Sequence, residues 1–258
     1  MIQNLKSFLQ KLFISQDVIY FMQKKHPIFI LALLLLAPTI TATTGHMKLL
    51  AVVDPITEQG AIADLYLTIK EGEGRVFLDT SPLTKIDTQM STRIAKEIAC
   101  NFLEFDCEQK DFFYTIRSNS PIIGGPSAGA AISVLTISLL DGLTIKEDIA
   151  ITGTINSGGI IGPVGGLKVK IDTASQKGIK KVLIPKMSLL AKENDSVSLR
   201  EYAKNLSVEL KEVGNLHEAI YEFTGKIYKI KRNKLNINPI YQKTMENISI
   251  KLCGRTSK

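Results

Sequence analysis

The sequence predicts an α+β fold, in which strands and helices are mixed without a regular βαβ repeat. Two patterns support this class. Alternating apolar and polar residues, typical of half-buried strands, follow residue 46, and apolar residues at helical spacing recur further along the chain. With 258 residues and an apolar fraction of 45%, the chain can bury a sizeable core.

The first elements are expected to form a hairpin-rich sheet, because three short alternating runs are separated by turn residues. Apolar residues at helical spacing then predict the first helix. In order, the expected elements are strands at residues 48–53, 62–69 and 75–78, a helix at 87–105, a strand at 107–116, a helix from 127 to about 140, short strands at 149–155 and 159–161, a helix at 168–177, a strand at 182–185, and a final pair at 208–210 and 216–223.

An apolar segment at residues 27–42 follows Lys24 and Lys25 and precedes small residues. Its uninterrupted apolar core is shorter than the roughly 18 residues of a spanning helix, which favours a signal peptide, with a membrane anchor or a buried core helix as alternatives. The positive flank predicts an extracytoplasmic protein, either secreted or anchored to the membrane by this segment.

The positive charge is concentrated at the two ends of the chain. The net charge is +7, but residues 225–258 carry nine Lys or Arg and one acid, and residues 1–26 carry four Lys and one Asp, which leaves −4 between them. Basic ends favour contact with a membrane surface or another polyanion, and no nucleic-acid-reading signature occurs. The expected organisation is a basic region with the signal or anchor at residues 1–45, a globular domain at 46–225 and a basic extension at 226–258.

Three cysteines are present, of which Cys100 and Cys107 flank the end of the first predicted helix. An oxidising exterior would permit a disulfide between them, and free buried thiols are the alternative. No cluster of Cys, His and carboxylates has the spacing of a metal site, so neither a metal nor a cofactor is expected.

Residues 124–131 read Gly-Gly-Pro-Ser-Ala-Gly-Ala-Ala, a turn followed by an apolar helix. Ser127 therefore lies at a helix N-terminus, beside Gly125, Pro126 and Ala128. Unpaired backbone N–H groups and the helix dipole stabilise negative charge there, as the oxyanion of acyl transfer requires. An N-cap serine is the non-catalytic alternative.

A nucleophilic serine needs a base within hydrogen-bond reach. The sequence has only three histidines, none in a Gly-rich or strand-end context, which makes a lysine the simpler candidate. Lys168 has Asp172 one turn later and is typical of a solvated helix face. Lys170 has the small neighbours Thr173 and Ala174, which would let its amine point inward and lose part of its basicity through desolvation. This pattern favours Lys170 slightly.

Three motifs occur in register: Pro-Ser-Ala-Gly at residues 126–129, Thr-Gly-Thr-Ile at 152–155, and Ile-Gly-Pro-Val-Gly-Gly-Leu-Lys-Val-Lys at 161–170. Together they resemble the proteolytic domain of Lon-type serine proteases. The resemblance implies a Ser–Lys dyad with Ser127 as nucleophile and Lys170 as base. It also places Thr152 on the threonine that hydrogen-bonds the lysine amine. Many Lon domains have an acid three residues before the serine, where this chain has Gly124.

The resemblance covers about residues 47–225, and residues 74–83 and 113–117 resemble small archaeal secreted or membrane-linked Lon-like proteins without an ATPase. No P-loop motif occurs. We therefore expect an ATP-independent endopeptidase that cleaves peptides or unfolded protein segments. The family resemblance also implies a possible homo-oligomer in the form of a hexameric ring.

Two other functions fit part of the pattern. A Lon-like domain with Gly124 in place of the acid could bind peptides or act as a scaffold without catalysis. The Gly-rich loop around Ser127 also resembles the phosphate-binding loop of small-molecule kinases related to galactokinase and mevalonate kinase. The kinase hypothesis does not explain the motifs around Thr152 and Lys170.

Overall fold

The computed structural model describes residues 42–54, 59–81, 83–119, 124–190, 198–229 and 238–256. Residues 1–41, which hold nearly all of the expected signal or anchor segment, lie outside this description. Within the described part of the chain, no helix combines the length and the apolar character needed to cross a membrane.

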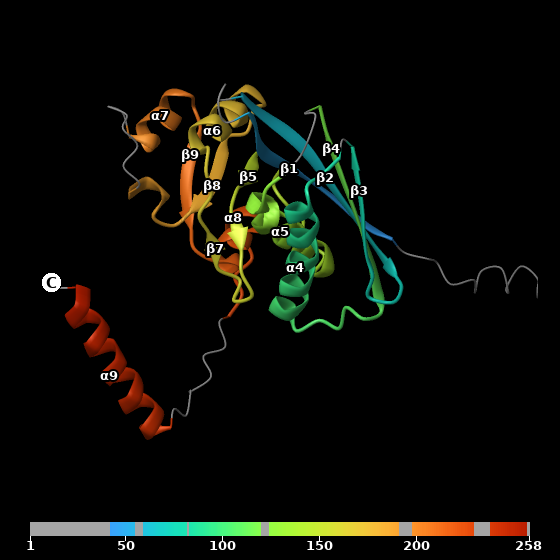
Figure 1. Ribbon diagram of the computed structural model, residues 1–258. Coiled ribbons are helices and arrows are strands. Elements are labelled where there is room, and N and C mark those ends of the chain that lie inside the picture. Colours follow the sequence, from blue (N-terminus) through green and yellow to red (C-terminus); the bar gives the residue numbers. More distant parts are fainter. Residues whose placement is uncertain are drawn as a thin grey trace, which may run out of the picture.

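A four-stranded sheet forms one layer of the molecule, in the order β1-β2-β4-β3 (Figure 1). The long strands β1 (Thr43–Asp54) and β2 (Gln59–Glu71) form an antiparallel hairpin, as the alternation predicts. The hairpin expectation is wrong for the third strand. β3 (Val76–Ser81) runs parallel to β4 (Lys110–Ser118), which lies between it and β2, because α4 (Ile86–Leu103) carries the chain back across the sheet.

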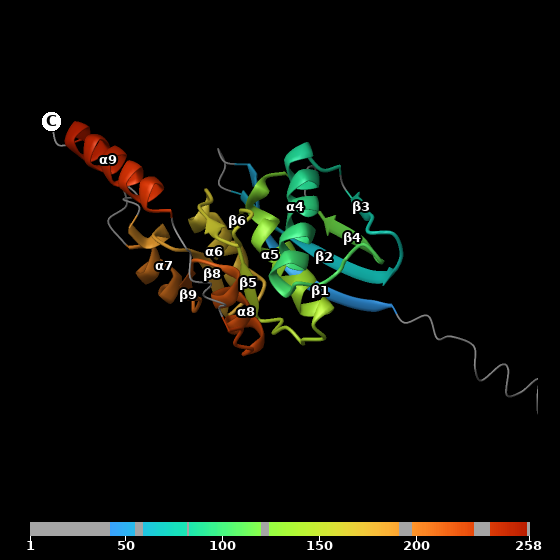
Figure 2. The same cartoon turned by 90° about the horizontal axis from the view of Figure 1, so that it is seen from below.

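Two helices, α4 and α5 (Gly129–Leu140), cover the inner face of this sheet (Figures 1 and 2). α5 is buried along almost its whole length, since apart from its glycine and three hydroxyl residues it consists of Ala, Ile, Val and Leu. The buried hydroxyl of Thr136 is satisfied because it donates to Ile132 O at 2.7 Å and shares a 2.8 Å hydrogen bond with Tyr114. α5 therefore lies at the centre of the main hydrophobic core.

The C-terminal half contains a second, three-stranded sheet in the order β5-β8-β9, with all three strands parallel. A helix connects each strand of this sheet to the next, which makes two βαβ crossovers. The sequence did not predict these crossovers, because β5 has only three residues and is followed by a Gly-rich loop. The elements are β5 (Ile149–Ile151), β6 (Thr154–Ile155), β7 (Ile161–Gly162), α6 (Leu167–Gln176), β8 (Lys181–Pro185), a 3-10 turn (Ser188–Leu190), α7 (Leu199–Asn205), β9 (Glu209–Val213) and α8 (Leu216–Thr224).

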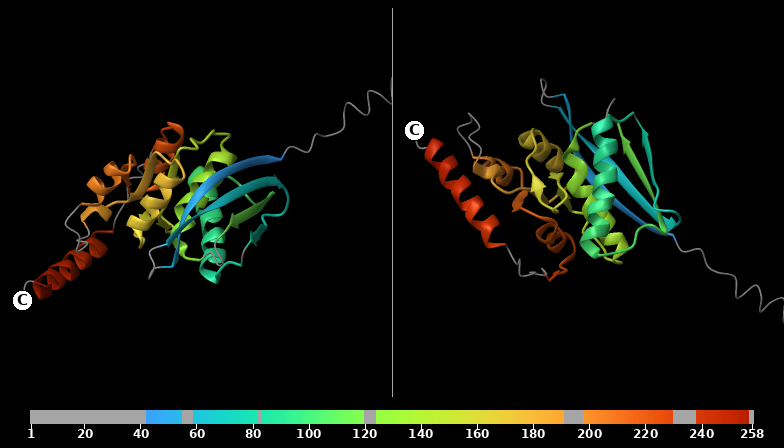
Figure 3. Two further views of the ribbon diagram at one scale, coloured as in Figure 1. Left: turned by 90° about the horizontal axis from the view of Figure 1, so that it is seen from above. Right: turned by 60° about the horizontal axis from the view of Figure 1, so that its bottom comes forward.

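The hairpin of β1 and β2 joins the two halves, because its far end reaches α6 and the second sheet (Figure 3). Met47 and Leu49 of β1 belong to the main core beneath α5, whereas Leu50 packs with Ala150 and Ile171 in a second core around α6 and β8. The two halves therefore form one body, and the expected mixture of helices and strands is confirmed.

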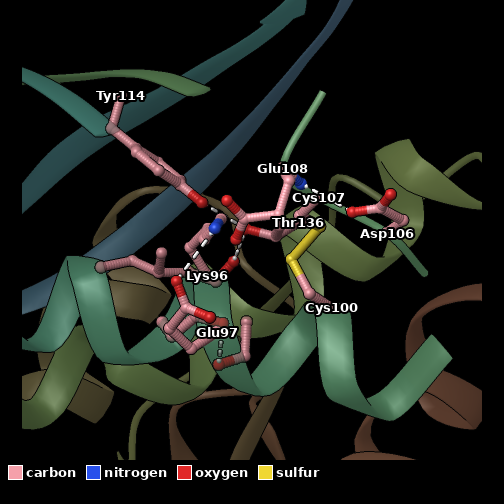
Figure 4. Close-up of a disulfide and its surroundings, with 11 residues drawn as sticks. Lys96, Glu97, Cys100, Asp106, Cys107, Glu108, Tyr114 and Thr136 are labelled. Atoms are coloured by element: carbon pink, nitrogen blue, oxygen red, sulfur yellow. Dashed lines mark hydrogen bonds and ion pairs between the residues drawn. A yellow bond between two sulfur atoms is a disulfide. The ribbon is translucent and has the colours of Figure 1, made fainter. Parts of the chain in front are cut away.

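A disulfide joins Cys100 to Cys107, with an S–S distance of 2.04 Å. Figure 4 shows the bond between the last turn of α4 and the segment that leads into β4, close to the buried side chains of Lys96 and Tyr114. The disulfide alternative is thus the correct one for this pair. Cys253 is exposed and forms no disulfide; it lies on the last helix, α9 (Pro239–Thr256), which Figure 1 shows apart from the body.

Candidate active site

The chain turns sharply before Ser127. Gly125 has φ 104°, a conformation that strains any residue with a Cβ, and it leads into a single 3-10 turn, Pro126–Ala128. α5 begins directly afterwards at Gly129. Ser127 is half-buried at this start, as the sequence predicts, where the first N–H groups of a helix lack intrahelical acceptors.

Backbone hydrogen bonds tie the serine turn to the strand segment that contains Thr152. The N–H group of Gly153 donates to Ser127 O at 2.9 Å, and Ala130 N–H donates to Gly153 O at 3.1 Å. A Cβ on Gly153 would lie 2.4 Å from Ile161 Cγ2, so only glycine allows this close approach. The position of Ser127 is therefore coupled to the position of Thr152.

The other side of Thr152 faces α6. Lys170 is only 3% exposed, and its Nζ donates to Thr152 Oγ1 at 2.9 Å. Thr152 is itself 1% exposed and is held by its N–H group, which donates to Leu183 O of β8 at 3.0 Å. Burial away from water disfavours the charged amine and lowers the pKa of Lys170 to about 8. The hydrogen bond expected between Thr152 and Lys170 is thus present.

The start of α6 decides which lysine points inward. Gly166 caps the helix with φ 66°, and a Cβ there would lie 2.6 Å from Val52 Cγ2, so the helix begins directly against β1. Lys170 follows one turn later on the inner face. Lys168 points elsewhere, with its Nζ 4.9 Å from the centre of the Tyr202 ring. The small residues that follow Lys170 favoured an inward-pointing side chain, and the burial of Lys170 confirms this prediction.

A cleft of about 560 Å³ brings these segments together, within the size range of small ligand sites. Ser127 and Lys170 both line it. Among the described residues no hydrogen bond joins their side chains, and catalytic hydrogen bonds are often long before substrate binds. The lining residues are Val52, Gly124, Gly125, Pro126, Ser127, Thr154, Pro163, Val164, Gly165, Gly166, Val169 and Lys170.

The predicted supporting residues take different places around this cleft. Gly125 and Pro126 line it, but Pro126 has no N–H group and cannot donate to an oxyanion. The side chain of Ala128 packs against the main core, and Thr152 lies behind Lys170 rather than on the cleft surface. Sequence reasoning missed Val52, which reaches the cleft from the end of β1; nothing in its local pattern distinguishes it from other strand residues.

The histidines are engaged away from the cleft. His46 Nε2 lies 2.9 Å from Asp64 Oδ1 across the β1–β2 pair, and the His217 ring packs 4.7 Å from the ring of Phe102. His26 lies outside the described residues. Lys170 is consequently the basic side chain that the described part of the chain places at the cleft.

Gly124, where many Lon domains have an acid, lies at the edge of the cleft against Lys85. A Cβ at this glycine would meet the side-chain carbons of Lys85, with Cδ at 2.6 Å. The exposed Lys85 directly precedes α4, whose buried Thr88 donates to Gly125 O at 3.5 Å. A cationic side chain therefore lies against Gly124 at the edge of the cleft.

Comparison with known proteins places this site in a family. Residues 108–222 match the Lon protease (S16) C-terminal proteolytic domain. The chain is 32% identical over 143 residues to the Lon protease of Paraburkholderia phytofirmans, covering 54% of this chain and 18% of that protein. It is 29% identical over 155 residues to the Lon protease of Azorhizobium caulinodans, covering 58% of this chain and 17% of that protein.

A shorter match of 79 residues reaches 39% identity with the Lon protease of Azospirillum brasilense, covering 31% of this chain and 10% of that protein. The chain thus spans less than a fifth of the length of these relatives. Ser127, Thr152 and Lys170 all fall inside the segment that matches the family. Residues 108–222 of this chain belong to the family of Lon protease C-terminal proteolytic domains.

Proposed function

We propose that the protein is a serine endopeptidase that uses Ser127 and Lys170 as a catalytic dyad. The observation that carries the proposal is the buried amine of Lys170, which lines the same cleft as Ser127 and is held from behind by Thr152. A neutral lysine has one lone pair. With one of its hydrogens donated to Thr152, that lone pair remains available for the serine proton.

In the proposed reaction, Ser127 Oγ attacks the carbonyl carbon of the scissile peptide bond while Lys170 Nζ takes the hydroxyl proton. The C–N bond then breaks as Lys170 returns the proton to the leaving amine, and water hydrolyses the acyl-enzyme by the same exchange. Backbone N–H groups at the turn that holds Ser127 are proposed to bind the oxyanion.

The buried lysine suits this role because a base works best with a pKa near the operating pH. At about 8, the pKa of Lys170 leaves a useful fraction of neutral amine at neutral pH, whereas an exposed lysine would be almost fully charged. The rate of cleavage should therefore rise with pH along a limb centred near pH 8.

The proposed substrates are peptides and unfolded protein segments, which the protein cleaves without using ATP. Apart from Lys170, the cleft is lined by Gly, Pro, Val, Ser and Thr, which suits a short extended segment of small or apolar residues. We also propose that the protein assembles into a hexameric ring and that it is located outside the cytoplasm, attached to the membrane through its N-terminal segment. The Cys100–Cys107 disulfide supports an oxidising compartment.

A fluorophosphonate probe and an unstructured fluorogenic peptide test the dyad together. The parent and Lys168→Ala should be labelled at Ser127 and should cleave the peptide. Ser127→Ala and Lys170→Met should lose cleavage by several orders of magnitude while keeping the parent's circular dichroism spectrum. Full activity of Lys170→Met would disprove the base assignment, and absence of both labelling and cleavage in the folded parent would support a peptide-binding scaffold instead.

A further inference from the structure

The edge of the cleft carries a lysine that the proposed dyad does not use. Gly124 lines the cleft, and the side chain of Lys85 lies directly against it. A Cβ placed on Gly124 would be 2.6 Å from Lys85 Cδ and 3.2 Å from Lys85 Cε, so the lysine stem occupies the space that a larger residue would fill. The amine is one C–N single bond, about 1.45 Å, beyond Cε and therefore lies at this edge as well.

No structural role accounts for the position of Lys85. It is the N-cap residue of α4, but its side chain makes no capping hydrogen bond, and a cation is unfavourable at the positive end of a helix dipole. Within the described part of the chain, the Lys85 side chain forms neither a hydrogen bond nor an ion pair. The nearest acid in the sequence, Asp87, accepts instead from the N–H group of Thr88 at 2.7 Å. The charge of Lys85 is thus left for a ligand.

The charges around the cleft select the ligand. Among the residues that the structure describes along its lining, none is acidic, and Lys170 is the one cation. A substrate carboxylate near Lys85 is therefore attracted, whereas a substrate lysine or arginine is repelled. Ser127 follows Gly124 by three residues, which span at most about 11 Å. Because an extended peptide advances about 3.3 Å per residue, this carboxylate lies within about three residues of the scissile bond.

We propose that Lys85 determines specificity by selecting peptides with an aspartate or glutamate within about three residues of the scissile bond. This inference rests on the proposed peptidase function, because it assigns Lys85 to the substrate of the same cleft. Lys85 binds a substrate side chain and leaves the reacting atoms to Ser127 and Lys170. Its contribution should therefore appear mainly in KM, as expected for a contact that is equally strong before and during the reaction.

Peptide binding to the full-length Ser127→Ala variant tests this selectivity without requiring cleavage. The probes are fluorescent, unstructured peptides with blocked ends and no other charges, in which Glu, Gln or Lys is moved along the peptide one position at a time. By fluorescence anisotropy at low salt, the best Glu peptide should bind about three- to five-fold more tightly than its Gln counterpart, the range of an exposed ion pair. The Lys peptide should bind more weakly than both. High salt should remove most of these differences.

Charge reversal at position 85 gives the sharpest comparison in the same background. Lys85→Glu should reverse the order, so that the Lys peptide binds more tightly than the Glu peptide, and Lys85→Gln should bind the three peptides alike. Both variants should keep the parent's circular dichroism spectrum, because Lys85 is exposed and makes no capping bond. Lys204→Glu is the matched control: this exposed lysine on α7 does not line the cleft, and its reversal changes the net charge by the same amount. It should retain the parental order.

Equal binding of the three peptides to Ser127→Ala, or no measurable binding, would overturn the selectivity of Lys85. Retention of the Glu preference in Lys85→Glu would overturn it too, as would a reversal of the same size in Lys204→Glu. In the chain with Ser127 intact, Lys85→Gln should raise KM for the Glu peptide about three- to five-fold and affect kcat much less. A parent that binds the Glu peptide selectively but cleaves none would contradict the peptidase proposal alone, so the two failures are distinguishable.

Discussion

At the scale of single residues, the position of Thr152 explains how the candidate base is held. Its hydroxyl accepts a hydrogen bond from Lys170, and the next residue, Gly153, binds the carbonyl of Ser127 through its N–H group. One dipeptide thus contacts both members of the proposed dyad. A change at Thr152 should therefore disturb chemistry more than folding.

Thr152→Val is expected to keep the fold, because valine has nearly the shape of threonine and the change removes only the hydroxyl that accepts from Lys170 Nζ. The lost hydrogen bond to the Lys170 amine is worth about 1.5–3 kcal/mol, or roughly one to two decades in rate. Comparing kcat for an unstructured peptide with the parent value measures this loss. A folded variant with parental kinetics would remove Thr152 from the proposed mechanism.

Lys170 also predicts how stability depends on pH. Its pKa is about 8 in the folded protein and 10.5 in its ordinary state, so the unfolded chain binds more protons between these values. The contribution of Lys170 is consequently least favourable below pH 8 and improves as the pH rises to 10.5. Lys170→Met removes this penalty, so it should raise the free energy of unfolding at pH 7 by about 3 kcal/mol.

Urea unfolding at several pH values measures this effect. The advantage of Lys170→Met over the parent should be largest at pH 7 and should shrink above pH 8. Lys177→Met, at an exposed position just beyond α6, serves as the control and should show no such trend. A constant difference between Lys170→Met and the parent from pH 7 to pH 10 would mean that the amine titrates as it does in water.

At the scale of elements, α4 connects the disulfide to the turn that holds Ser127. Its last turn carries Cys100, and its first turn carries Thr88, whose hydroxyl donates to Gly125 O. The helix also lies against α5, which begins just after the proposed nucleophile. The disulfide thus anchors the far end of an element that borders the site.

Replacing both cysteines, in Cys100→Ser with Cys107→Ser, should lower the free energy of unfolding by roughly 2–3 kcal/mol, because the bond closes a short loop in the unfolded chain. Dithiothreitol should have the same effect on the parent and none on the double variant. Cys253→Ser, at an exposed cysteine outside the disulfide, should leave stability unchanged. Equal stability of parent and double variant would mean that native packing already provides the constraint.

At the scale of the whole molecule, we propose that the protein works at a membrane outside the cytoplasm, because its N-terminal segment is apolar and its C-terminal segment is basic. The disulfide in the domain agrees with such a compartment, since cytosolic thiols are kept reduced. The positive flank at Lys24 and Lys25 predicts the same orientation.

Fractionation of cells that produce the tagged chain tests this location. The domain should be found in the membrane or extracytoplasmic fraction with Cys100 and Cys107 protected from alkylation. A mature N-terminus between residues 43 and 46 would indicate a cleaved signal, and an intact N-terminus in the membrane fraction would indicate an anchor. Full-length chain with reactive cysteines in the cytosolic fraction would contradict the proposal.

The sequence alone determined the features that depend on local pattern. Glycine and proline before an apolar run placed Ser127 at the start of a helix, and the small residues after Lys170 favoured its inward direction. Alternation of apolar residues found the β1–β2 hairpin. The resemblance to Lon domains then selected Lys170 and Thr152 from several candidates, and the comparisons confirmed that family.

Only the tertiary structure decided what depends on distant parts of the chain. Pairing of β3 with β4 follows from the path of α4, and Val52 joins the cleft because the end of β1 meets Gly166. The lowered pKa of Lys170 requires the surrounding segments that exclude water, and the Cys100–Cys107 bond requires the turn between α4 and β4. Local sequence sets which face of an element is apolar, whereas burial and contact depend on what packs against that face.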